Sequence, residues 1–116
     1  MDAARAKRWP PPPDLESIRE LVRTADPEGH LAEGAHADEY EPEENAILEA
    51  IGHLDTPDLL ATTTRPLIEA IWQKSFGHEN TVGSKRTKAL AGLAHEIERF
   101  FGPQAVPQVR STKNRL

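Results

Sequence analysis

Apolar side chains recur at helical spacing in four stretches of the chain, and this periodicity is its main structural signal. The first stretch predicts a helix over 15–25 that begins at Asp14, a good N-cap, and ends before Pro27. The second predicts a helix from about Pro42 to His53, because proline suits the first helical position.

The third stretch contains a proline, and the fourth does not. Pro66 lacks a backbone donor, so we expect a break near it, with a short helix at about 57–63 and a longer one at about 66–76. The fourth stretch predicts a helix from Ser84, its N-cap, to Phe101.

No stretch shows the sustained alternation of a strand, so the pattern predicts an all-α bundle of four to five helices. The 116 residues have room for one domain, which we place at 14–103. A proline-rich arm at 1–13 and a basic tail at 104–116 flank it, and both are expected to be flexible. A long polar loop is expected at 26–41.

Charge is divided unevenly along the chain. Residues 14–58 hold fourteen acids and two bases, a net charge of −12, while residues 65–116 hold nine bases and four acids, a net charge of +5. The overall charge of −5 conceals this division. An acidic N-terminal half suggests a partner with a cationic surface. The division also allows a homo-oligomer in which the acidic half of one copy docks on the basic half of another.

Composition excludes several classes of function. The chain has no cysteine, so it has no disulfide framework, thiolate metal site or cysteine nucleophile. No apolar run approaches the length of about 20 residues that a membrane span needs, and no signal-peptide pattern is present, so we expect a cytoplasmic protein. The acidic balance argues against nucleic acid as a partner.

The predicted loop and the helix after it carry the candidate site. Its residues have a structural interpretation, because Asp26 can accept backbone N–H bonds at a helix end and Tyr40 can lay its ring on the core with its hydroxyl outward. Acids around an aromatic ring are also what a basic partner surface would meet. The predicted partner-binding residues are Asp38, Glu39, Tyr40, Glu41, Glu43 and Glu44.

The segments DPEGHL at 26–31 and GAHADEYEPE at 34–43 resemble a known pattern. The YugE-like family of small helical bacterial proteins carries a DP-x-G step and a G-A-P-x-D-E-Y-x-x-E step between its first two helices. This chain departs from the pattern at His36, where the family favours proline, and at His30, where an apolar residue is usual. The resemblance covers about residues 15–76. It implies a small helical protein with no assigned reaction, for which an immunity or antitoxin-like role is one suggestion.

We therefore expect a non-catalytic protein-binding module without a cofactor. The alternative from another class is a small metal-dependent hydrolase that uses His30, His36 and Asp38, whose side chains are possible metal ligands. Their spacing matches neither HExxH nor an EF-hand loop, so we expect no metal site.

Overall fold

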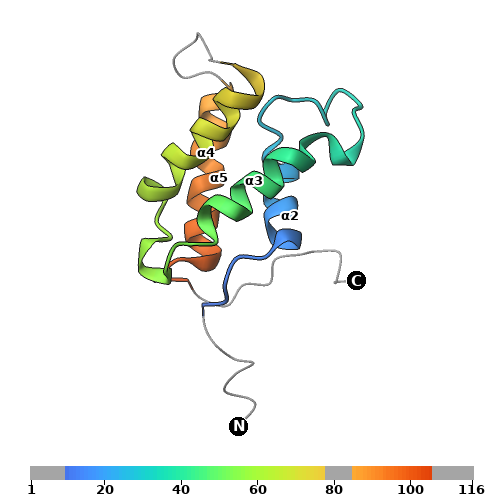
Figure 1. Ribbon diagram of the computed structural model, residues 1–116. Coiled ribbons are helices and arrows are strands. Elements are labelled where there is room, and N and C mark those ends of the chain that lie inside the picture. The colour runs from blue at the N-terminus through green and yellow to red at the C-terminus, as the bar shows by residue number, and fades with distance from the viewer. Residues whose placement is uncertain (1–9, 78–84, 106–116) are drawn as a thin grey trace.

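The computed structural model describes residues 10–77 and 85–105, and four α-helices dominate this part of the chain (Figure 1). Two short 3₁₀-helices, η1 and η2, precede the second and third of them. No strand occurs in the described residues, so the predicted all-α bundle is confirmed. The elements are α2 (Leu15–Ala25), η1 (Ala37–Tyr40), α3 (Glu41–Ile51), η2 (Thr56–Asp58), α4 (Ala61–Phe76) and α5 (Lys85–Phe101).

The four helices enclose one core. α2 packs against α3 and α5, and α4 packs against the same two helices, so each helix has two neighbours (Figure 1). None of the described helices combines the length and the apolar character that crossing a bilayer requires. The buried apolar residues are Ile18, Val22, Tyr40, Ile47, Ile51, Leu59, Ile68, Trp72, Leu90, Leu93, Ala94, Ile97 and Phe101.

α2 has the bounds that the sequence predicts. The Asp14 carboxylate accepts the backbone N–H of Ser17 at 3.0 Å and the Ser17 hydroxyl at 2.8 Å, as expected of an N-cap. Ile18 and Val22, four residues apart on one face, are fully buried. α3 begins at Glu41, one residue before the prediction, and ends at Ile51.

The break expected near Pro66 is wrong. α4 runs without interruption from Ala61 to Phe76, and η2 together with the first turn of α4 lies where the separate short helix was expected. Proline removes the bond that would reach the carbonyl of Thr62, four residues earlier. Both Pro66 and Thr62 are exposed, so water can satisfy that carbonyl, and burial of Ile68 and Trp72 holds the helix in place.

α5 begins at Lys85, directly after the predicted N-cap, and ends at Phe101, the predicted last residue. Its N-terminus borders undescribed chain. The expected Ser84 cap and the loop before it lie outside the described residues, as do most of the two terminal arms. The domain bounds of 14–103 therefore stay a prediction.

Candidate functional site in the loop between α2 and α3

The loop that follows α2 is built around the carboxylate of Asp26. One oxygen, Oδ1, accepts the Tyr40 hydroxyl at 2.7 Å and the backbone N–H of Leu31 at 3.1 Å. The other, Oδ2, accepts the backbone N–H of Ala32 at 2.9 Å. Asp26 itself has a φ of 46°, a left-handed conformation that ends α2, and its N–H donates to Val22 at 2.8 Å. The predicted role of Asp26 as an acceptor at a helix end is confirmed.

Tyr40 closes the loop from the other side. Its hydroxyl oxygen accepts the backbone N–H groups of Glu28 at 3.0 Å and His30 at 3.4 Å while its proton goes to Asp26. The residue is fully buried, so the expectation of an outward hydroxyl is wrong. The hydroxyl turns inward because three loop partners offer it hydrogen bonds that replace those of water.

This arrangement shifts the acidity of both side chains. Burial raises the pKa of the Tyr40 hydroxyl, and its bond to the Asp26 carboxylate raises it further. Burial by itself would raise the pKa of Asp26, but the hydrogen bonds from Tyr40, Leu31 and Ala32 outweigh it and lower the value below 3.8. The pair is therefore a neutral phenol donating to a carboxylate at neutral pH.

An aromatic cluster lies beneath the loop. The rings of His30 and Tyr40 are stacked with centroids 5.8 Å apart. The ring of Phe76 makes a T-shaped contact with each of them. Trp72 completes the cluster at 5.7 Å from both Tyr40 and Phe76. The Nδ1 atom of His30 lies 3.2 Å from a carboxylate oxygen of Glu39, within ion-pair distance but without hydrogen-bond alignment. The loop is thereby packed onto the end of α4.

Arg86 ties the same loop to the far part of the chain. Its side chain is 11% exposed and pairs with the Glu28 carboxylate, 58 residues away. Its Nη1 also donates to the carbonyl of Gly77 at 2.6 Å, at the end of α4. The loop, α4 and α5 thus share one largely enclosed guanidinium group, a contact that helical periodicity gives no means to predict.

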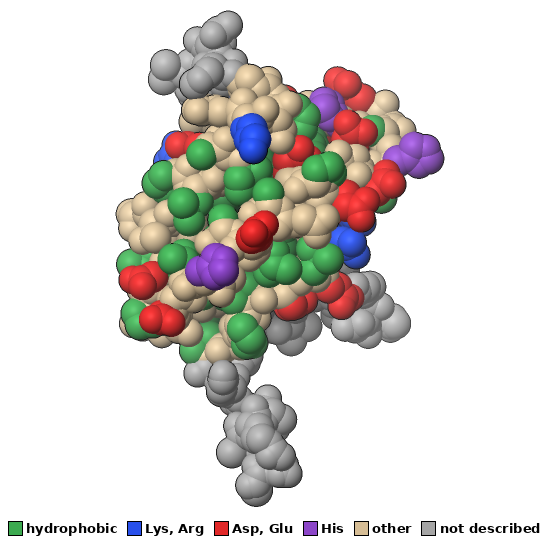
Figure 2. Space-filling view, in the orientation of Figure 1, with side chains coloured by type: hydrophobic (Ala, Val, Ile, Leu, Met, Phe, Trp, Pro, Cys, Tyr) green, Lys and Arg blue, Asp and Glu red, His purple; other side chains and the backbone are tan. Residues whose placement is uncertain are grey.

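The predicted partner-binding residues divide into two groups. Asp38 and Glu39 on η1 and Glu41 at the start of α3 are exposed, and we call these three residues the acidic edge. Figure 2 shows acidic side chains and histidines together at this end of the molecule. The N-terminal end of α3 is a favourable place for such carboxylates because of the helix dipole. The other three residues, Tyr40, Glu43 and Glu44, are buried.

The Glu44 carboxylate is paired with two arginines of α2. This fully buried carboxylate lies 3.1 Å from Nε of Arg23 and 3.7 Å from Nε of Arg19, and Arg19 also reaches the Glu41 carboxylate at 3.6 Å. Buried Glu43 leaves its Oε1 without a hydrogen-bond partner among the described residues. The sequence does hold a signal for these pairs, since two arginines lie four residues apart on one predicted helix and two acids lie three residues apart on the next.

The residues of the metal hypothesis are not gathered together. His30 is half-buried in the aromatic cluster, while His36 and Asp38 are exposed. In residues 10–77 and 85–105, no group of three His, Asp or Glu side chains is placed to hold a metal ion. The geometry of this part of the chain therefore offers nothing that favours the metal-dependent hydrolase.

Comparison with known proteins adds no relative. No family model, no curated protein and no solved structure matches the chain.

Proposed function

We propose that the protein is a non-catalytic binding module that presents the acidic edge, Asp38, Glu39 and Glu41, to a basic surface of a partner protein. The observation that supports this most is the contrast within the loop. The three acids of the acidic edge are exposed, while Tyr40, which lies between Glu39 and Glu41, is fully buried and hydrogen-bonded to Asp26 at 2.7 Å. Exposed charges are thus carried on backbone that the core holds in position.

Such preorganisation lowers the cost of binding. A loop that must become ordered on contact loses conformational entropy, and this loss subtracts from affinity. Here Asp26 and Tyr40 hold the loop before any partner arrives. The carboxylates would act mainly by steering a cationic partner and fixing its orientation, since exposed ion pairs each contribute only about 0–1 kcal/mol.

The buried residues of the original prediction take a supporting role in this proposal. Tyr40 and Glu44 are inaccessible to a partner in this conformation, and both connect the start of α3 to α2 or its loop. Replacing them should act on binding through stability. Replacing members of the acidic edge should act on binding directly.

One specific version of the proposal follows from the resemblance to the YugE-like family. An immunity or antitoxin-like protein inhibits a basic toxin by covering its cationic site, and an acidic surface suits that task by charge complementarity. This version and the general one predict the same dependence on salt, because both rely on exposed charges.

The test is affinity capture from native lysate at low salt, followed by mass spectrometry. The bait is the wild-type chain beside the triple reversal Asp38→Lys, Glu39→Lys and Glu41→Lys. A control with the same change in net charge reverses three exposed acids elsewhere, Glu49→Lys, Asp55→Lys and Asp58→Lys. A basic protein retained by wild type and control but lost from the first variant supports the proposal. Equal retention by all three baits, or equal loss from both variants, contradicts it.

A further inference from the structure

His30 is packed in place by aromatic rings, whereas Glu39 beside it extends to the surface. The imidazole stacks on Tyr40 and makes a T-shaped contact with Phe76, with centroids 5.8 Å apart in both cases. The backbone N–H of His30 also donates to the Tyr40 hydroxyl at 3.4 Å. Glu39 lies on η1 with its side chain 39% exposed, and its carboxylate is not aligned for a hydrogen bond to the imidazole. His30 is therefore the fixed member of this pair, and the Glu39 carboxylate has room to move.

The nitrogen that faces Glu39 determines the tautomer of His30. Nδ1 is enclosed and lies 3.2 Å from a carboxylate oxygen of Glu39. A bare ring nitrogen and a carboxylate oxygen repel each other at this distance, so Nδ1 carries the proton when the ring is neutral. The atom that gains a proton as the pH falls is then Nε2. Protonation there places a positive charge beside Glu39 and strengthens the attraction between the Nδ1–H group and the carboxylate.

Other charged side chains around His30 come from the loop and from α5. They are Asp26, Glu28, Lys85 and Arg86. Arg86 is already paired with Glu28, and the Asp26 carboxylate already accepts three hydrogen bonds. From α4 the imidazole meets an uncharged aromatic ring. Glu39 is therefore the acid that is placed to respond when the charge of His30 changes.

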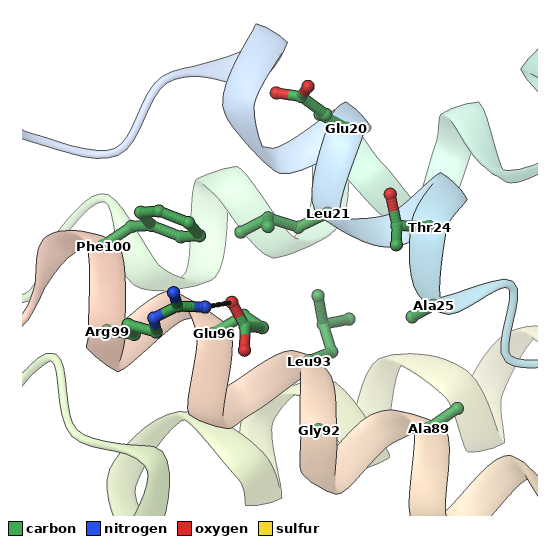
Figure 3. A pocket seen from close by; sticks show the side chains of 10 residues that line it. All are labelled: Glu20, Leu21, Thr24, Ala25, Ala89, Gly92, Leu93, Glu96, Arg99 and Phe100. Atoms are coloured by element: carbon green, nitrogen blue, oxygen red, sulfur yellow. Dashed lines mark hydrogen bonds and ion pairs between the residues drawn. The ribbon is translucent and has the colours of Figure 1, made fainter. Parts of the chain in front are cut away.

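Carboxylates that pair with arginine in the same molecule have a permanent counter-charge. Glu41 of the acidic edge lies 3.6 Å from Arg19, and on α5 Glu96 accepts a hydrogen bond from Arg99 at 2.9 Å (Figure 3). A guanidinium group is not deprotonated in proteins, so these pairs do not depend on pH in the physiological range. Histidine changes its charge between about pH 5 and pH 8, so the counter-charge of Glu39 is present only in the acidic part of that range.

We infer that His30 regulates the acidic edge by pH: as the ring takes up a proton, it draws the Glu39 carboxylate out of the edge. Because Glu41 already has Arg19 as its partner, Asp38 then remains as the acid of the edge without a cation among the described residues. The ion pair is complete while His30 is protonated and is lost as the pH rises through the titration of the ring. This regulation rests on the proposed function, because a basic partner of the acidic edge is what would sense the change.

The first measurement follows the side-chain carboxyl carbons of the glutamates by nuclear magnetic resonance from about pH 5 to about pH 8, above the range in which glutamate itself ordinarily titrates. The Glu39 signal should shift as the His30 ring titrates, and the Glu41 signal should change little. His30→Phe keeps an aromatic ring but cannot take up a proton, so the Glu39 shift should be lost. His36→Phe removes another histidine of the same loop and should retain the shift. Circular dichroism checks that each variant is folded.

The second measurement is the affinity for rhodamine-labelled octalysine, a basic probe that stays charged over the same range because lysine titrates near pH 10.4. Other histidines also gain charge on acidification, so the variants are compared with one another. The loss of affinity between about pH 8 and about pH 5 should be about threefold larger for the wild-type chain than for His30→Phe. Glu39→Gln should match His30→Phe, because the responding carboxylate is gone. His95→Phe, at an exposed position on α5, should match the wild-type chain.

The outcomes separate this regulation from the proposed function. A Glu39 signal that does not move with pH, or that moves equally in His30→Phe, overturns the regulation whatever the probe does. An equal loss of affinity in the wild-type chain and His30→Phe also overturns it, because Glu39 then stays available to the probe. Octalysine that fails to bind the wild-type chain, or that binds the triple reversal at the acidic edge equally tightly, contradicts the proposed function, while the Glu39 signal still decides whether the pair with His30 forms.

Discussion

Glu98 and Arg86, both on α5, reach opposite ends of α4. The Glu98 carboxylate accepts the backbone N–H of Ala61, the first residue of α4, at 2.7 Å. The Arg86 guanidinium donates to the carbonyl of Gly77, just beyond the last residue of α4, at 2.6 Å. An anion at a helix N-terminus and a cation at its C-terminus both complement the helix dipole. The residue before α4, Leu60, offers no side-chain cap, so the neighbouring helix supplies one.

We predict that Glu98→Ala lowers the free energy of unfolding by about 1 kcal/mol, the usual cost of losing an N-cap acceptor. Glu98→Gln keeps an acceptor oxygen but not the charge, and should cost only a few tenths of a kcal/mol. Urea denaturation followed by circular dichroism measures both. Glu96→Ala, which removes an acid from the same helix but no cap, is the control. An equal effect of Glu98→Ala and Glu96→Ala would show that the cap contributes nothing particular.

Tyr40→Phe should destabilise the fold more than its small change in shape suggests. The hydroxyl is acceptor for two backbone N–H groups and donor to Asp26, so its loss leaves buried polar groups without a partner. We expect a loss of about 1–3 kcal/mol in the free energy of unfolding, measured by denaturation. A double-mutant cycle with Asp26→Asn should show coupling between the two positions. Additive effects of the two substitutions would contradict the hydrogen-bonded pair.

The acidity of Tyr40 can be observed directly, because it is the only tyrosine in the chain. Its folded-state pKa is raised above the ordinary value of 10.0 by burial and by the Asp26 carboxylate. The neutral phenol is thus favoured by folding, and its contribution to stability is complete below pH 10 and is lost as the pH rises above that value. Tyrosinate absorbance should therefore appear above pH 10, together with the loss of helical circular dichroism.

The pH at which tyrosinate absorbance appears, compared with the pH at which the helical circular dichroism is lost, shows whether the phenol titrates before or with unfolding. If tyrosinate absorbance developed near pH 10 while the helical signal was unchanged, Tyr40 would be accessible and the hydrogen-bonded pair would be wrong. In Asp26→Asn the anionic neighbour is gone, so the absorbance change should begin at lower pH than in the wild-type chain.

The sequence predicts the local elements of this fold well and the long-range contacts poorly. The bounds of α2 follow from Asp14 and the apolar residues of one face, which are local signals. The continuity of α4 through Pro66 does not follow from local signals, because it depends on which side of the helix faces solvent. The same distinction between local signals and long-range contacts holds for the candidate site. The acidic character of Asp38, Glu39 and Glu41 is readable from sequence, but the burial of Glu44 depends on where Arg19 and Arg23 lie after packing. The bond between Arg86 and Glu28 depends on the whole bundle.

Substitution by alanine should change stability in opposite directions at Gly92, inside α5, and at Gly102, just after its last residue. At Gly102, which is buried, a Cβ atom would lie 2.6 Å from the carbonyl oxygen of Leu59 and 2.7 Å from that of Glu98, so Gly102→Ala must displace backbone. We expect it to lower the free energy of unfolding by about 1–3 kcal/mol, as overpacking does. Gly92→Ala has open space around its new methyl group and should raise stability by about 0.5–1 kcal/mol through helix propensity. Thermal and urea denaturation of the two variants side by side measure the difference. Stabilisation at both positions would show that Gly102 is not tightly packed, whereas destabilisation at Gly92 would reveal a structural need for glycine there.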